Sequence, residues 1–193
     1  MRVAIIDSGV HAAHPHVQGV SGGIAFHDDG SESADYADRL GHGTAVTAVI
    51  RAQAPQAELF AVKVFHERLS ANIGTLIRAM DWAIARQMDF INLSLGVEKR
   101  EHERLLRAVV DRAGGTRIVA AKGWLPGDLP GVIPVALDWD CPWDEVRERE
   151  DVYYACGYPR PIPGVPVEKN LHGISFAVAH VTAWLATGKK NTG

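Results

Sequence analysis

The stretch RVAIIDSGV, residues 2–10, decides the fold class, because an uninterrupted apolar run ends abruptly in polar residues. Residues 3–6 are apolar throughout, as expected of a strand that is buried on both faces of a parallel sheet. Asp7 closes this run. Ligands of such sheets bind beyond the carboxyl ends of the strands, so Asp7 is a candidate functional residue. A turn or helix cap is the alternative interpretation of the same residue.

Working outward from this strand, apolar runs alternate with helical patterns along most of the chain. In residues 70–87, Ile73, Ile77, Met80 and Ile84 form one apolar stripe, and residues 99–113 carry a second stripe opposite charged residues. This alternation predicts right-handed βαβ units and a three-layer α/β domain. The strand-like runs are 2–7, 22–26, 59–65, 90–95, 117–121 and 132–138.

The bulk composition is that of a globular domain. The chain has 193 residues, of which 47% are hydrophobic, and this is enough for a sizeable core. We expect one domain over residues 1–187 and a flexible tail over 188–193. The net charge of −3 offers no electrostatic reason to expect nucleic acid or an anionic membrane as a partner. The sequence shows no signal-peptide pattern and no transmembrane-length apolar run, so we expect a cytoplasmic protein.

Residues 139–171 form the irregular part of the sequence. They predict an acidic, aromatic stretch, then a short strand, then a proline-rich loop. The acidic segment 144–151 is most simply a solvated surface, with a protein partner as the alternative. Cys141 and Cys156 lack the spacing of metal ligands, and a disulfide between them stays open.

Two further short motifs carry candidate functional residues. In GHGTAVTAVI, residues 41–50, His42 stands between two glycines, just before Thr44, which is a suitable N-cap for a helix. The flanking glycines leave the imidazole accessible. In LHGISFAVAHV, residues 171–181, Ser175 opens an apolar helix. Ser175 is either the N-cap of that helix or a nucleophile at its start.

Together, Asp7, His42 and Ser175 supply the groups of nucleophilic acyl transfer. Each stands at a strand end or a helix start, so we expect all three to meet at one edge of the sheet. There the serine would attack, the histidine would take its proton, and the aspartate would orient the imidazole. Their order along the chain, Asp, His, Ser, is the one found in subtilisin.

The chain resembles the subtilisin-like serine proteases, or subtilases, over most of residues 2–186. The segments that carry the resemblance follow in the family's order: VAIIDSGV, HPHV, GGIAF, GHGTAVTAVI, APQAELFAVKVF, DWAIARQMDFINLSLG, IVAAKG, GVIPVALD and GISFAVAHV. The resemblance implies a three-layer α/β/α fold with a mostly parallel sheet, and it assigns Asp7, His42 and Ser175 as the triad. It also places Ser94, Leu95 and Gly96 on one wall of the substrate cleft and Gly123 on another. A peptide substrate would pair there as an extended strand.

The sequence departs from the family pattern around the expected oxyanion hole. After the apolar run the family has Ala-Gly-Asn or Ser-Gly-Asn, whose Asn side chain donates to the oxyanion, whereas this chain has Lys122, Gly123 and Trp124. Loss of one such donor costs about 10²–10³ in kcat. The Trp124 indole N–H or the Lys122 ammonium would be a substitute donor, although we expect Trp124 to point elsewhere and Lys122 to face solvent. Ile174 replaces the threonine that usually precedes the serine.

Segments that many relatives carry are absent from the sequence. Residues 51–57 leave no room for the calcium-binding loop of many relatives, so we expect no structural calcium, and we expect no propeptide before residue 1. His11, His14 and His16 suggest a metal site, but they also fit the family's ordinary loop. We therefore expect no metal and no cofactor.

The sequence thus supports two hypotheses. The first is a serine endopeptidase that hydrolyses peptide bonds through an acyl-enzyme, for example to mature one peptide or protein precursor; acyl transfer to an amine is a variant of it. The second is a pseudoprotease that binds a peptide or a partner protein in the same cleft. The intact triad favours the first hypothesis, and Trp124 and Ile174 favour the second.

Overall fold

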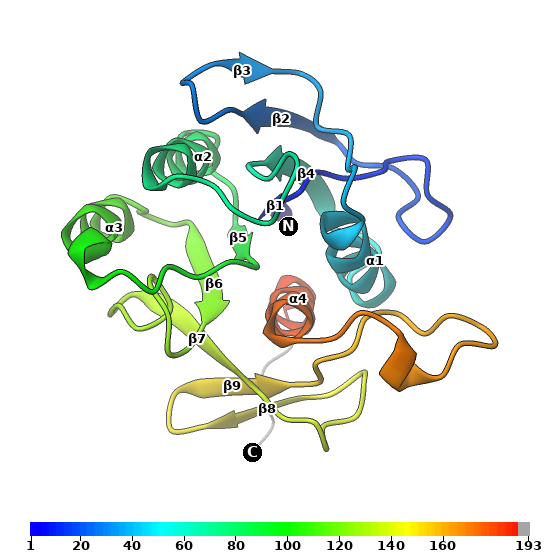
Figure 1. Ribbon diagram of the computed structural model, residues 1–193. Helices are drawn as coiled ribbons and strands as arrows, with labels where there is room; N and C mark the ends of the chain where they lie inside the picture. The colour runs from blue at the N-terminus through cyan, green and yellow to red at the C-terminus, as the bar shows by residue number, and fades with distance from the viewer. Residues whose placement is uncertain (189–193) are drawn as a thin grey trace.

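The computed structural model describes residues 1–188 and shows a nine-stranded sheet with helices on both faces (Figure 1). The strand order is β3-β2-β4-β1-β5-β6-β7-β9-β8. The strands from β2 to β9 in this order run parallel, and the edge strands β3 and β8 are antiparallel to their neighbours. The strands are β1 Arg2–Asp7, β2 Gly22–Phe26, β3 Glu32–Ser33, β4 Glu58–Lys63, β5 Phe90–Leu93, β6 Arg117–Ala121, β7 Val132–Leu137, β8 Val146–Arg149 and β9 Val152–Ala155.

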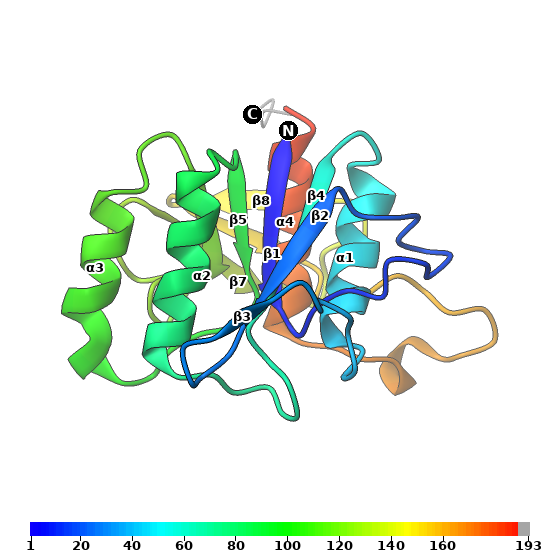
Figure 2. The ribbon, with the colours of Figure 1, turned by 90° about the horizontal axis from the view of Figure 1, so that it is seen from above.

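Two hydrophobic clusters, one on each face of the sheet, explain why the central strands are apolar throughout. In β1, Ala4 and Ile6 belong to the cluster under α2 (Ile73–Ala85) and α3 (Glu103–Asp111), whereas Val3 and Ile5 belong to the cluster under α1 (His42–Gln53) and α4 (Ile174–Ala186). Successive side chains of a strand point to opposite faces, so a strand covered on both sides needs apolar residues at every position. Figure 2 shows the two helix pairs on opposite sides of the sheet.

Helix α4 is the most deeply buried of the four helices. Residues from Phe176 to Ala183 along it are all buried, and it packs against α1 and the sheet. A helix that is apolar all round is expected in such a position. The first turn of α4 lies beside the end of β5, where Ser175 hydrogen-bonds the carbonyl of Ser94.

The structure confirms the predicted three-layer α/β/α fold with a mostly parallel sheet. Three local predictions are wrong. Helix α1 begins at His42 with Gly41 as N-cap, so Thr44 lies inside the first turn and does not cap the helix. The pattern over 99–113 begins with a short 3-10 turn, Arg100–His102, before α3. The region 139–171 contains a two-stranded hairpin, β8 and β9, rather than one short strand, because β9 continues the parallel sheet beside β7.

Three further features of the chain concern the two cysteines, the C-terminal tail and membrane-spanning helices. Cys141 and Cys156 are buried and unpaired, and burial raises the pKa of both thiols. Of the predicted tail over residues 188–193, only Gly188 belongs to the described residues, and the rest lies outside them. In the described range 1–188, every helix is too short or too polar to cross a membrane.

Candidate active site

Asp7 and His42 form a short hydrogen-bonded pair at the carboxyl edge of the sheet. Asp7 is the last residue of β1 and is fully buried, and its Oδ1 lies 2.7 Å from His42 Nδ1. The same oxygen accepts the Ser8 N–H at 2.7 Å. Nδ1 must carry a proton to donate to the carboxylate, so Nε2 of the neutral ring is the free acceptor. This tautomer is the one that a general base needs.

The pKa of His42 reflects opposing influences. Burial lowers this pKa, but the hydrogen bond from the ring to Asp7 and the negative charges of Asp7 and Asp38 outweigh burial and raise it above 6.5. The imidazolium is therefore favoured more than in a free histidine. A base whose charged form is stabilised in this way takes up a proton readily, and it is active only at pH values where the ring begins neutral.

Gly43 lets the start of α1 approach β1 closely enough for this pair to form. A Cβ on Gly43 would collide with the Gly9 carbonyl oxygen and would lie 3.1 Å from Asp7 Cβ. The glycine after His42 is therefore required by backbone proximity as well as by access to the imidazole.

Asp38, which the sequence analysis did not identify, clamps the start of α1 to the end of β1. It accepts five hydrogen bonds: from Ser8 Oγ at 2.9 Å, from the N–H groups of Leu40, Gly41 and Thr44 at 2.9 Å each, and from Thr44 Oγ1 at 2.6 Å. Ser8 Oγ in turn accepts the Gly43 N–H at 2.9 Å. Desolvation raises the pKa of Asp38, but these hydrogen bonds outweigh it and lower the pKa below its ordinary value. An acidic residue four positions before His42 was the available sequence signal.

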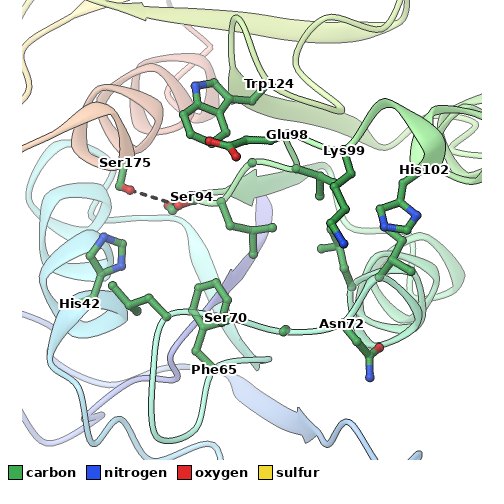
Figure 3. Close-up of a pocket in the computed structure, with 17 residues that line it drawn as sticks. His42, Phe65, Ser70, Asn72, Ser94, Glu98, Lys99, His102, Trp124 and Ser175 are labelled. Atoms are coloured by element: carbon green, nitrogen blue, oxygen red, sulfur yellow. Dashed lines mark hydrogen bonds between the residues drawn. The ribbon is translucent and has the colours of Figure 1, made fainter.

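Ser175 is the second residue of α4 and does not cap the helix. Gly173 is the N-cap, and it makes no side-chain cap hydrogen bond. The Ser175 hydroxyl donates to the Ser94 carbonyl oxygen at 3.1 Å, and among the described residues no hydrogen bond joins it to His42. Figure 3 shows Ser175 and His42 next to each other at one end of a cleft. The structure therefore brings all three predicted triad residues to one place, with the Ser–His contact still open.

Asn92, a second residue that the sequence analysis missed, ties Ser94 to α4. It is fully buried at the end of β5. Its Nδ2 donates to Ser94 Oγ at 2.7 Å, and its Oδ1 accepts from Thr182 Oγ1 at 2.9 Å. The carbonyl that receives the Ser175 hydroxyl is thus held in place by a buried polar network. A polar residue inside an otherwise apolar strand was the signal for this network.

A cleft of about 670 Å³ runs from His42 and Ser175 across the carboxyl edge of the sheet (Figure 3). Ser94, Leu95 and Gly96 line it, as the sequence analysis expected for one wall. Gly96 is exposed and the other two are half-buried, so the backbone of this wall is accessible. Figure 3 shows Lys99 and His102 at the end of the cleft away from His42, and Glu98 beside Trp124.

The structure treats the two predicted oxyanion residues, Trp124 and Lys122, and the predicted wall residue Gly123 differently. Trp124 lines the cleft, but its ring packs against Gly96, where an added Cβ would lie 2.6 Å from Trp124 Cβ. Gly123 is not among the cleft-lining residues, and its N–H donates to Asp128 Oδ1 at 2.7 Å. Lys122 is exposed and also lies outside the lining. The first turn of α4 holds the remaining donor, the Ser175 backbone N–H.

His11, His14, His16 and His180 do not line this cleft. His11, His14 and His16 stack edge to face, with ring centroids 6.1 and 5.2 Å apart. Within residues 1–188, no group of three or more His, Cys, Asp or Glu side chains is arranged to hold a metal ion. His180 is fully buried between Gln53 and the Tyr158 carbonyl, at 2.8 and 2.9 Å, and burial lowers its pKa to about 4.

An Asp–His pair and a serine at the carboxyl edge of a three-layer, mostly parallel sheet define the site of a serine-hydrolase-like protein. The model of the family described as the subtilase family matches residues 1–127, which is more than half of the chain. The chain therefore belongs to the subtilase family.

Several known proteins are similar to this chain. Subtilisin E of Bacillus subtilis (strain 168) is 38% identical over 130 residues, which cover 63% of this chain and 33% of that protein. Minor extracellular protease Epr of the same organism is 33% identical over 200 residues, covering 97% of this chain and 29% of that protein. A thermostable alkaline protease of Halalkalibacterium halodurans is 35% identical over 215 residues, which cover 97% of this chain and 56% of that protein. The chain thus spans about a third of the length of subtilisin E.

The fold has a relative among solved structures. The crystal structure of a cold adapted subtilisin-like serine proteinase superposes with a TM-score of 0.69 and 20% sequence identity. The match covers 97% of this chain and 74% of that one, and it shows that the two share a fold.

Proposed function

We propose that this chain is a serine endopeptidase that cleaves peptide bonds through an acyl-enzyme on Ser175. The observation that carries the proposal is the buried Asp7–His42 pair at 2.7 Å, whose imidazole borders the same cleft as the Ser175 hydroxyl. Membership of the subtilase family and the similarity to named proteases support it.

The geometry suggests a role for each group in the reaction. Rotation of the Ser175 side chain from the Ser94 carbonyl toward His42 would let Nε2 accept the hydroxyl proton as Oγ attacks the peptide carbonyl. Asp7 would stabilise the imidazolium, which would then protonate the leaving amine. A water molecule that gives its proton to His42 would then attack the acyl-enzyme, and His42 would return the proton to Ser175 Oγ as the acyl product leaves. Serine–histidine contacts are often long in free enzymes and shorten when substrate binds, so the open contact is compatible with this mechanism.

The substrate class that fits is a peptide bound in extended form along Ser94, Leu95 and Gly96. The accessible backbone of this wall follows directly from β5, so a peptide added there would continue the sheet. We propose further that the physiological substrate is a particular peptide or protein precursor.

A pseudoprotease is the second candidate, and specific observations favour it. The ring of Trp124 stands against Gly96 at the place where the family carries a donor for the oxyanion, and no hydrogen bond of its indole N–H is found among the described residues. Ser175 also directs its proton at Ser94 and not at His42. Such a protein would bind a peptide or a partner in the cleft without turning it over.

Labelling with an alkyl fluorophosphonate, followed by intact mass, separates the two candidates. The endopeptidase proposal predicts one adduct on the wild type and none on Ser175→Ala or His42→Ala. Circular dichroism must show that all three proteins are folded. A folded wild type without an adduct would reject the endopeptidase and leave the pseudoprotease.

A further inference from the structure

A small cavity of about 90 Å³ opens directly beside Ser175, next to the long cleft. Its walls come from three parts of the chain: Ser94–Gly96 after β5, Ala121 at the end of β6 with Trp124 after it, and Ile174 and Val178 on α4. No charged side chain lines it. A side chain on the acyl side of the bond attacked by Ser175 has this cavity within reach.

The two sides of the cavity are fastened together by the backbone. Val97 donates to the Leu125 carbonyl at 2.9 Å, and Leu125 donates to the Val97 carbonyl at 3.1 Å. Trp124, one residue before this bridge, packs its ring over Gly96. Moving the Gly96 and Trp124 walls apart would break these two backbone hydrogen bonds and the packing of the indole on Gly96, and both losses cost free energy.

The size of the cavity sets which side chains fit. An apolar cavity of about 150 Å³ is known to hold a benzene ring, and the present cavity, at about 90 Å³, is clearly smaller. By this comparison a hydrogen atom or a methyl group fits with room to spare, whereas the smaller volume disfavours a phenyl ring. The apolar lining also disfavours a charged side chain, because no partner would replace its lost hydration.

We propose that Trp124 is a specificity-determining residue that restricts the substrate's acyl-side residue to one with a small, uncharged side chain, such as glycine or alanine; this inference rests on the proposed function. Two departures from the family pattern, Trp124 and Ile174, line the same cavity. Trp124 forms part of one wall, and Ile174 contributes a branched apolar side chain to another. The substrate class is thus a peptide with a small, uncharged residue immediately before the cleaved bond.

Peptide 4-nitroanilides that differ only in the acyl-side residue test the proposal. We expect the kcat/KM of the wild type to be at least 100-fold higher for alanine than for phenylalanine. Trp124→Ala should raise the value for phenylalanine at least 10-fold, so that the ratio of the alanine value to the phenylalanine value falls at least 10-fold. Trp139→Ala is the matched control, because Trp139 is a surface tryptophan, 50% exposed against 40% for Trp124, and it does not line the cavity.

Binding provides a readout that does not depend on turnover. The same peptides as free acids, titrated calorimetrically into Ser175→Ala, should bind at least 10-fold more tightly with terminal alanine than with phenylalanine. Adding Trp124→Ala should remove that difference. Equal binding, preference for phenylalanine, or no binding of any peptide would overturn the specificity proposal. Failure of the endopeptidase proposal is separate, because it shows as an absent fluorophosphonate adduct.

Discussion

Replacing Asp38 tests whether the clamp at the start of α1 builds the catalytic geometry. Asp38→Ala removes the acceptor of five hydrogen bonds. Leu40 and Gly41 are exposed, so water can satisfy their N–H groups in the variant. Ser8 and Thr44 are buried, so their donors lose their partner without replacement.

The expected loss follows from these buried donors. Each polar group left unsatisfied in the interior costs about 1–3 kcal/mol, so we expect Asp38→Ala to lower the free energy of unfolding by about 3–5 kcal/mol. Asp38→Asn keeps one oxygen acceptor but turns an amide toward the Thr44 N–H, and we expect a smaller loss of about 1–2 kcal/mol. The clamp positions the start of α1 and therefore His42, the general base. Fluorophosphonate labelling of Ser175 should consequently slow at least 10-fold in both variants.

Urea unfolding measures the loss of stability, and labelling kinetics measure the slower reaction of Ser175. Asp35→Ala is the control. Asp35 lies in the same loop, but its ion pair with Arg39 is exposed on both sides, and such pairs contribute about 0–1 kcal/mol. An Asp38→Ala variant with the unfolding midpoint and labelling rate of Asp35→Ala would refute the clamp.

Three further predictions address the packing and ionisation of histidine-bearing segments. Gly43→Ala should abolish fluorophosphonate labelling and lower the free energy of unfolding in urea by more than about 2 kcal/mol, because the added Cβ collides with the Gly9 carbonyl. Gly115→Ala is the control: the space around Gly115 is open, so this variant should change stability by less than about 0.5 kcal/mol. The labelling rate should rise with pH through a midpoint above 6.5, because His42 must lose its proton to act as a base. Asp38→Asn removes a negative charge near His42 and should shift this midpoint to lower pH. A midpoint that does not move would contradict the effect of the Asp38 charge. The pKa of His180 is about 4 in the folded protein, below the unfolded value of about 6.5, so its contribution to stability is lost as pH falls from 6.5 to 4. His180→Gln should reduce the difference in unfolding free energy between pH 7 and pH 4.5 by about 2–3 kcal/mol, and an unchanged difference in urea titrations would show that His180 is not the group responsible.

The fold was predictable because its signals are local. Each central strand is a short apolar run that is covered on both faces, and the helices between them carry apolar stripes at helical spacing. The hairpin of β8 and β9 was missed, because its outer strand is exposed and charged and lacks any apolar pattern. Its strand character comes from backbone pairing with β9, which residue types alone do not reveal.

The candidate triad was equally predictable as a set of residues. Asp7 ends a strand, and His42 and Ser175 start helices, so the rule that ligand sites lie at the carboxyl ends of parallel strands brings them together. The supporting residues were not predictable in the same way. Asp38 and Asn92 gain their roles from partners that fold against them, and Asn92 meets Thr182 across 90 positions of sequence.

The sequence by itself determined the layered α/β architecture and the identity of the residues at the strand ends, because both depend on the order of apolar and polar residues along the chain. It also showed that Trp124 and Ile174 depart from the family pattern. Only the tertiary structure decided what these departures do. The packing of Trp124 on Gly96 and the bridge between Val97 and Leu125 arise where loops after different strands meet, and that meeting sets the size of the cavity beside Ser175.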